Sequence, residues 1–295
     1  MENKSKQLSC WVCDHNNLKK VRESKIDEDL KSENFFITNS DYGKTAAIYK
    51  CSNCGFLQCP YLTDVISFYE QMEDNQYEEG RDQRLLQERK VMEQIQKIKP
   101  GGKLLDIGAG SGILVQAALE LGYDAEGVEP SKWLHKQAQK LNLPVELGIF
   151  PQEDRLKGPY DVVTLVDVIE HVGDPKGLVK SIREVLKEDG ILIVVTPDVD
   201  SVMAKTLKYK WWHFRIAHIG YFNKKNLNLV MEKAGFSVFK LMRPTWFFSV
   251  AYLLERVSAY LPGKMSVPAP KFIKELIIPI NLRDSWMGIY KKGIK

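Results

Sequence analysis

Residues 103–130, KLLDIGAGSGILVQAALELGYDAEGVEP, decide the fold. An apolar run enters a glycine-rich turn, a helix-like segment follows, and a second short apolar run ends in Glu129. Short apolar runs that alternate with amphipathic helices are typical of a parallel sheet. In such sheets ligands bind at the carboxyl ends of the strands, so this stretch predicts a binding site at the glycine turn.

The same rhythm continues to the end of the chain. Periodicity predicts helices at 113–121, 131–141, 176–186 and 224–234, after a connecting helix in RLLQERKVMEQIQKIK whose apolar residues share one face. The fold class is therefore α/β. The expected strands lie at 103–107, 125–129, 145–147, 161–165, 191–196 and 236–241, with a last strand at 285–292.

Composition sets broad limits on function. The chain has 295 residues, 44% of them hydrophobic and 27% charged, which is ordinary for a globular protein. A net charge of +4 without a dense basic block argues against nucleic acid as a partner. The polar start, MENKSKQLSC, lacks the apolar core of a signal peptide, so we expect a cytoplasmic protein.

The glycine turn narrows the choice of ligand. Gly108, Gly110 and Gly112 let the backbone approach a ligand closely, as in dinucleotide sites, but the third glycine of that motif falls on Ile113. Asp106 beside the turn would repel a pyrophosphate and suits a cation. S-adenosylmethionine carries an ammonium, a sulfonium and a ribose diol without phosphate. Glu129 is placed to accept hydrogen bonds from the two ribose hydroxyls.

Five segments in order strengthen this interpretation: LLDIGAGSG, GVEPS, YDVVTLVDVIEHVGDP, VLKEDGILIVVTPD and HIGYFNKKNLNLVMEKAGF. Over roughly residues 80–295 the chain resembles a class I S-adenosylmethionine-dependent methyltransferase. The resemblance implies a transferase with a Rossmann-like fold, a mostly parallel seven-stranded sheet whose last strand is antiparallel. It also implies a cofactor site made of Asp106, Gly108, Ala109, Gly110, Gly112, Glu129, Pro130, Gly148, Ile149, Phe150, Asp167 and Val168.

The block DVIEHVGDP follows the fourth strand of this sheet. It is similar to the acid-x-x-acid-His block of ubiquinone-pathway O-methyltransferases, in which such residues can hold a divalent cation. Asp167, Glu170 and His171 would suit a hard or borderline ion. The alternative, which we favour, is that Glu170 and His171 shape the methionine pocket and cap the next helix.

A second candidate for the reacting end is WWHFRIAHIGYF, residues 211–222, an aromatic cluster expected over the methyl acceptor. Methyl transfer to oxygen needs a base for the hydroxyl proton, and a neutral imidazole suits that role at neutral pH. His218 matches the H-x-x-Y-F position of the resembling subgroup and is the first candidate. His213 is the second, His171 is a further one, and a satisfied core histidine is the structural alternative.

We expect the acceptor to be a small molecule, a hydroxyl of a sugar or related metabolite. A carbon acceptor on a nucleotide-linked keto-sugar is the alternative reaction. A protein that binds S-adenosylmethionine without catalysis is the alternative outside enzymes.

Four of the five cysteines form two pairs, CWVC and CSNCG. Two such knuckles supply four thiolates to a tetrahedral Zn²⁺ ion, so Cys10, Cys13, Cys51 and Cys54 predict a structural zinc site. Cys59 lies outside the set. A zinc-ribbon-like module ahead of a methyltransferase domain resembles bacterial enzymes that methylate sugars or related small metabolites.

We divide the chain at shifts in pattern: zinc-knuckle module 1–60, helical connector 61–100, methyltransferase core 101–244, apolar helical insertion 245–283 and final core strand 284–295. The insertion contains an apolar run of about fifteen positions, short of a membrane span. We expect a lid or a self-association face, which would make a homo-oligomer. Contact with a membrane surface is the less favoured alternative.

Overall fold

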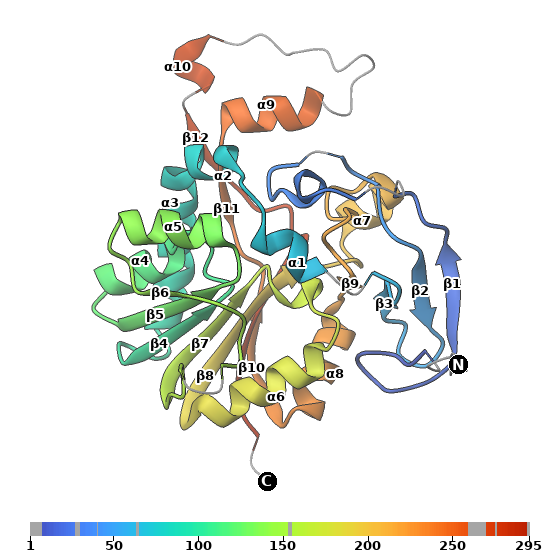
Figure 1. Cartoon of the computed structure of the whole chain (residues 1–295), viewed down its shortest axis with the longest axis horizontal. Coiled ribbons are helices and arrows are strands. Elements are labelled where there is room, and N and C mark those ends of the chain that lie inside the picture. Colours follow the sequence, from blue (N-terminus) through green and yellow to red (C-terminus); the bar gives the residue numbers. More distant parts are fainter. Residues whose placement is uncertain are drawn as a thin grey trace.

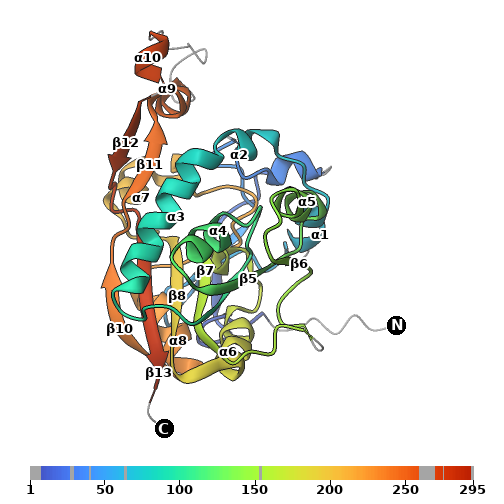
Figure 2. The ribbon, with the colours of Figure 1, turned by 90° about the vertical axis from the view of Figure 1, so that its left-hand side faces the viewer.

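The structure is a computed structural model that describes residues 8–26, 30–39, 41–62, 65–152, 155–258, 270–274 and 276–293. A twisted seven-stranded sheet forms its centre, with helices on both faces (Figure 1). A small cysteine-containing sheet lies beside it, and an arm extends away from the body, as Figure 2 shows in profile.

The central sheet has the order β10-β13-β8-β7-β4-β5-β6. Strands β4 to β8 pair in parallel, and β13 pairs antiparallel with both β8 and β10. The predicted fold class, a mostly parallel seven-stranded sheet with an antiparallel last strand, is therefore confirmed. The strands are β4 Lys103–Ile107, β5 Asp124–Glu129, β6 Val145–Leu147, β7 Tyr160–Val166, β8 Leu186–Pro197, β10 Phe236–Met242 and β13 Ser285–Lys292.

Alternation along the strands divides the apolar core into two layers. Leu105, Val163 and Leu192 face a cluster with helices α6 and α8, whereas Leu104, Val162 and Ile193 face a cluster with α3 and α4. Side chains cap two of the helix starts: Ser131 and Asn223 accept hydrogen bonds from backbone amides of the first turn. The helices are α3 Arg81–Gln96, α4 Ile113–Glu120, α5 Lys132–Lys140, α6 Pro175–Val185 and α8 Lys224–Lys233.

The cysteine-containing module joins the core through a shared sheet. Its strands β1 Leu18–Arg22, β2 Ile48–Cys51 and β3 Leu57–Gln58 are antiparallel, and β3 pairs with β9 Gly220–Tyr221 from the core. A third apolar cluster spans both parts. It combines module residues such as Phe35 and Ile48 with Trp211, Phe214 and Tyr221. The short helices of this region are η1 Ser32–Phe35, α1 Val65–Glu70, α2 Asn75–Glu79, η2 Ile169–His171, α7 Val202–Leu207 and η3 Lys208–Lys210.

The segment expected to be a helical insertion contains strands as well. Strands β11 Trp246–Ser249 and β12 Ile277–Ile280 pair antiparallel and carry helices α9 Val250–Ser258 and α10 Lys271–Lys274 at their far end (Figure 1). Arg256 of α9 donates hydrogen bonds to the Tyr42 hydroxyl and the Thr38 carbonyl of the module. Residues 259–269 of this segment lie outside the described residues. Within the described ranges, no helix has the length and apolar character needed to cross a membrane.

Candidate functional site

A cavity of about 620 Å³ opens at the carboxyl edge of the parallel strands. The loops after β4, β5, β6 and β7 supply much of its lining, which is where ligands bind in open α/β sheets. The predicted cofactor residues meet here although they are spread over sixty positions of the chain. The lining includes every one of them except Gly112: Asp106, Gly108, Ala109, Gly110, Glu129, Pro130, Gly148, Ile149, Phe150, Asp167 and Val168.

The three glycines of the loop have two different roles. All have positive φ, a conformation that side chains other than glycine adopt at a cost. A Cβ atom at Gly108 would meet Val168, and one at Gly110 would meet the Tyr77 hydroxyl, so these two positions let the loop lie close to side chains that line the cavity. Gly112 instead lies where a Cβ would meet Leu143 and Val145, which makes it a packing position at the start of α4.

Glu129 is buried at the tip of β5, where its carboxylate fixes the loops around the cavity. Its Oε2 accepts a hydrogen bond of 2.8 Å from the Gly110 amide, and its Oε1 accepts one of 2.7 Å from the Ser131 amide. Each oxygen keeps a second acceptor position, which suits a pair of ligand hydroxyls. Burial raises the pKa of Glu129 to about 7, although the two backbone amides lower it.

Asp106 is also buried and accepts a 2.6 Å hydrogen bond from the Thr164 hydroxyl. Burial raises the pKa of Asp106 to about 7, with a further increase from the charge of Glu129. Burial also raises the pKa of Asp167, to about 6. Several carboxyl groups that repel one another in one cavity favour a cationic ligand.

Helices α2 and α3 cover the cavity with residues that the sequence analysis missed: Tyr77, Arg84, Gln87 and Glu88. Arg81 fastens α3 to the glycine loop by donating to the Ser111 hydroxyl at 2.8 Å. One of these four residues, Glu88, could have been recognised from the sequence. Glu88 falls inside the apolar stripe of Leu85, Met92 and Ile95, where a surface helix has no reason to carry a charge.

All three candidate histidines line the cavity. The His171 Nδ1 atom lies 2.8 Å from the Ala217 carbonyl, which fixes a proton on that nitrogen, and burial lowers the pKa of His171 to about 4. His218 packs edge-on against His171 and face-on against His213. Burial first, then the neighbouring His171, His213 and Arg215, hold the pKa of His218 well below its usual value.

His213 has an acidic partner that the sequence did not indicate. Its Nε2 lies 3.7 Å from the Asp284 carboxylate, and the Asp284 side chain is 4% exposed. Burial alone would raise the pKa of Asp284, but the interactions with His213, the Asp284 backbone and Trp211 together leave its pKa below the ordinary value. Asp284 precedes the final strand, far from His213 in the sequence, so only the fold brings the two together.

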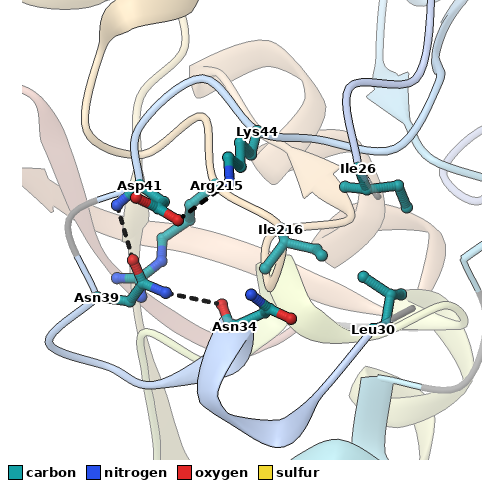
Figure 3. Close-up of a pocket in the computed structure, with 8 residues that line it drawn as sticks. All are labelled: Ile26, Leu30, Asn34, Asn39, Asp41, Lys44, Arg215 and Ile216. Atoms are coloured by element: carbon teal, nitrogen blue, oxygen red, sulfur yellow. Dashed lines mark hydrogen bonds and ion pairs between the residues drawn. The ribbon is translucent and has the colours of Figure 1, made fainter. Parts of the chain in front are cut away.

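Arg215, which like His213 belongs to residues 211–222, also lines the cavity and binds the module. Its guanidinium donates hydrogen bonds to the Ile37 and Phe36 carbonyls. On its other side, Figure 3 shows a small hollow in which Asn34, Asn39 and Asp41 are linked by hydrogen bonds. That hollow has about 20 Å³, room for about one water molecule. It is too small for a metabolite, so the large cavity is the candidate site.

The aromatic residues of 211–222 do not form the expected acceptor wall. Trp211, Phe214, Tyr221 and Phe222 are buried between the module and the core, and none of them lines the cavity. The reason is that β9 pairs with the module, which turns the aromatic side chains into a shared core. The histidines and Arg215 of the segment point to the cavity instead. None of the described residues of the 245–283 arm lines the cavity either.

Two groups of metal-binding side chains occur among the described residues. In one, ligand atoms of Glu170, His171 and His218 lie within 4.8 Å of one another. His218 therefore takes the place expected of Asp167. Glu170 is itself buried behind the lining, where its Oε2 accepts a hydrogen bond from the Thr196 hydroxyl at 2.8 Å.

The other group consists of Cys10, Cys13, Cys51 and Cys54. The sulfurs of Cys10 and Cys54 are 3.5 Å apart, as are those of Cys13 and Cys51, and all four lie within 4.8 Å. A tetrahedral Zn²⁺ site with ordinary zinc–sulfur bonds has sulfurs about 3.8 Å apart. The donor set and its spacing therefore fit zinc. Cys59 lies apart in another buried cluster.

The strand order, the glycine loop and the acids at the first two strand tips define a class I, S-adenosylmethionine-dependent methyltransferase fold. A family profile described as a methyltransferase domain matches residues 77–241, more than half of the chain. The chain belongs to this methyltransferase family.

Similar proteins agree with this assignment. The chain is 32% identical over 107 residues to a ubiquinone biosynthesis O-methyltransferase of Actinobacillus pleuropneumoniae, a match that covers 32% of this chain and 46% of that enzyme. It is 33% identical over 99 residues to the Acinetobacter baumannii protein of the same name, covering 30% and 41%. The matches thus span less than half of these relatives.

Solved structures show the same fold at low identity. A SAM-dependent methyltransferase of Archaeoglobus fulgidus superimposes with a TM-score of 0.50 at 17% identity, covering 74% of this chain and 100% of that one. A chain from the Haloferax volcanii complex of the Trm112 methyltransferase activator and a methyltransferase gives 0.52 at 13% identity, covering 79% and 99%.

Proposed function

We propose that the protein transfers a methyl group from S-adenosylmethionine to a hydroxyl of a small molecule, a sugar or related metabolite. The observation that carries this is a single cavity with the cofactor residues and the three histidines in its lining. The alternative of a carbon acceptor would use the same cavity and the same base. Family membership supports methyl transfer, and the ubiquinone O-methyltransferase relatives support oxygen as the acceptor atom.

The residues present suit S-adenosylmethionine. Asp106 and Asp167 provide the anionic surroundings for a cation, and Glu129 keeps acceptor positions for the ribose hydroxyls. Ile149 and Phe150 supply the apolar surface that a flat base needs. When bound, S-adenosylmethionine supplies an electrophilic methyl group on a positively charged sulfur.

Among the histidines we assign the base to His213. Asp284 orients its ring through Nε2 and stabilises the positive charge that appears when Nδ1 takes the acceptor's proton. His218 is the weaker base, because burial and its neighbours make protonation costly. Orientation of the acceptor in the cavity contributes the remainder of the rate.

We also propose that Cys10, Cys13, Cys51 and Cys54 bind one structural Zn²⁺ ion. Four thiolates fill a tetrahedral site and leave no position open for catalysis. The ion would hold the module against the core, since Cys51 ends β2 and β3 pairs with β9.

A labelled-methyl screen tests the function. The protein is incubated with S-adenosylmethionine labelled in the methyl group and a panel of sugars, nucleotide-linked sugars and phenols. Label in an oxygen-methylated product supports the proposal, and label on carbon selects the alternative reaction. If the nucleoside binds but label never leaves it, the protein is a binding protein rather than an enzyme.

A further inference from the structure

The side of the large cavity that faces the module carries a positive charge. Arg215 lines the cavity there, since its guanidinium donates hydrogen bonds to the backbone carbonyls of Phe36 and Ile37, and Ile37 lines the cavity as well. Carboxyl groups occur where the cofactor is expected, at the strand ends with Asp106 and Glu129. A cavity with an acidic part and a basic part fits two ligands of opposite charge.

Arg215 keeps N–H donors that no described residue uses. The carbonyls of Phe36 and Ile37 are its only hydrogen-bond partners among the described residues, so two of the five N–H donors of the guanidinium are used and three remain. Both partners are neutral and leave the charge of the guanidinium uncompensated. The hollow on the other side of Arg215 has room for about one water molecule, so a larger anion has to come from the cavity.

The ionisable groups around Arg215 do not supply the missing anion. The charge of Arg215 lowers the pKa of four of them, in each case as a smaller cause than burial: Tyr69, Asp167, His171 and His218. Asp167 is the one carboxylate among the four, and it acts on Arg215 only at a distance, without an ion pair. It also faces His213 and Arg84. A ligand anion in direct contact would offset the charge of Arg215 better than this distant carboxylate.

We propose that Arg215 binds an anionic group of the acceptor, a carboxylate or a phosphate, and thereby makes the enzyme select acidic hydroxyl compounds over neutral ones. The inference rests on the proposed function. A guanidinium suits either group, because its planar N–H donors match two oxygens of a carboxylate or a phosphate. His213 lies two residues away in the same segment and lines the same cavity. The anion and the hydroxyl that gives its proton to His213 would therefore belong to one small molecule.

Matched acceptors test the inference on the whole protein. Glucose, glucuronate and glucose 6-phosphate share a ring of hydroxyls and differ in charge, as catechol and 3,4-dihydroxybenzoate do. The wild-type protein should transfer labelled methyl to the anionic member of a set with a kcat/KM about 10–100-fold above that of the neutral member, the contribution of one charged hydrogen-bonded pair. The carboxylate and the phosphate of the glucose set then show which anion the site takes.

Substitution of Arg215 separates anion binding from its structural contacts. Arg215→Gln should lower kcat/KM for the preferred anionic acceptor by about 10–100-fold and leave the neutral acceptor within about 3-fold, so that the preference disappears. Arg215→Lys keeps the charge without the planar arrangement of donors and should retain part of the preference. Calorimetry should show an affinity for S-adenosylhomocysteine within about 3-fold of the wild type in both variants.

Arg256→Gln is the matched control. Arg256 also donates a hydrogen bond to a backbone carbonyl of the module, that of Thr38, but it lies on α9 and does not line the cavity. Its substitution removes a similar bond to the module and should leave the preference for anionic acceptors unchanged.

The outcomes distinguish this inference from the proposed function. Equal kcat/KM for neutral and anionic acceptors in the wild type, or a preference that survives in Arg215→Gln, would overturn anion binding and leave methyl transfer standing. Equal losses for both kinds of acceptor in Arg215→Gln would overturn it as well, because they would give Arg215 a structural role alone. If no acceptor is labelled, the proposed function fails, and this inference fails with it.

Discussion

At the scale of single residues, the candidate site consists of buried ionisable side chains that lack some of their hydrogen-bond or charge partners. The acids Asp106 and Glu129 could be predicted because they lie at the carboxyl ends of strands, and strand ends are visible in the sequence. Asp284 and Arg84 could not, because their significance depends on contacts across the fold. Only Glu88 can be recognised from the local sequence, because it is a carboxylate within the apolar stripe of its helix.

The pair of His213 and Asp284 predicts a specific kinetic behaviour. Asp284→Asn should lower kcat by about 10–100-fold while KM for S-adenosylmethionine stays the same, since the ring loses its orienting anion. The measurement is steady-state kinetics at one pH with an acceptor from the labelled-methyl screen.

Two further variants complete this test. His213→Asn should lower kcat by about 100-fold or more, and His218→Asn should lower it less. An unchanged rate in His213→Asn, together with a large loss in His218→Asn, would return the role of base to His218.

The burial of Glu88 should lower the free energy of unfolding of the protein as the pH rises. Its ordinary pKa is 4.5, and in the folded protein burial raises it to about 8. The folded state therefore holds a proton that the unfolded state releases, so stability is greatest at low pH and is lost as the pH rises from 4.5 to about 8.

Without ligand, Glu88→Gln should raise the free energy of unfolding at pH 8.5 by about 2–4 kcal/mol and change it little at pH 5. Urea unfolding at both pH values measures this, with Glu93→Gln as control, because Glu93 lies on the same helix and makes only an exposed pair with Lys90. An equal effect at both pH values would show that Glu88 is not the titrating group.

At the scale of elements, the sequence was most informative where the apolar period was regular. The strands and helices of the central sheet lie where periodicity predicts them, within a few residues at their ends. The strands of the module, β9 and the β11–β12 pair were not predicted. Their short strands bury few side chains in a regular pattern, and their identity depends on pairing partners distant in the chain.

The packing of the glycine loop against its neighbours can be tested at Gly112. Gly112 has φ +77° and a Cβ there would meet Leu143, so Gly112→Ala should lower the free energy of unfolding by about 1–3 kcal/mol. Because Gly112 lies outside the cavity lining, affinity for S-adenosylhomocysteine should stay within about 3-fold. Thermal unfolding and calorimetry measure the two effects. A large loss of affinity with unchanged stability would place Gly112 in the cofactor site after all.

At the scale of the whole molecule, module and core form one structure around the cavity. Ile37 and Tyr69, both within the first seventy residues, line the cavity. Arg215 of the core donates a hydrogen bond to the Ile37 carbonyl. The division drawn from the sequence makes residues 1–60 a separate module. That this module is a folding unit of its own stays a prediction. What composition could not indicate is that β3 and β9 belong to one sheet.

The zinc site predicts effects at a distance. Cys51→Ser should abolish binding of one zinc ion per chain and lower the melting temperature by about 5–10 °C. Methyl transfer should decline more than affinity for S-adenosylhomocysteine, because the segment with His213 and His218 packs on the module. Elemental analysis, thermal unfolding and calorimetry measure the three quantities.

Cys59→Ser is the matched control, since Cys59 is buried apart from the four ligands. Full zinc content and unchanged melting in Cys51→Ser would remove the metal site.

The pairing of Leu57 with Tyr221 and of Gln58 with Gly220 limits how this protein can be cut or recombined. A fragment that starts after the module would expose an unpaired edge and the aromatic side chains of 211–222 to solvent, and it should aggregate. A chimera that takes only the front segment from a relative would mismatch two halves of one interface. The front segment and residues 211–222 therefore have to change together, although they are distant in the gene.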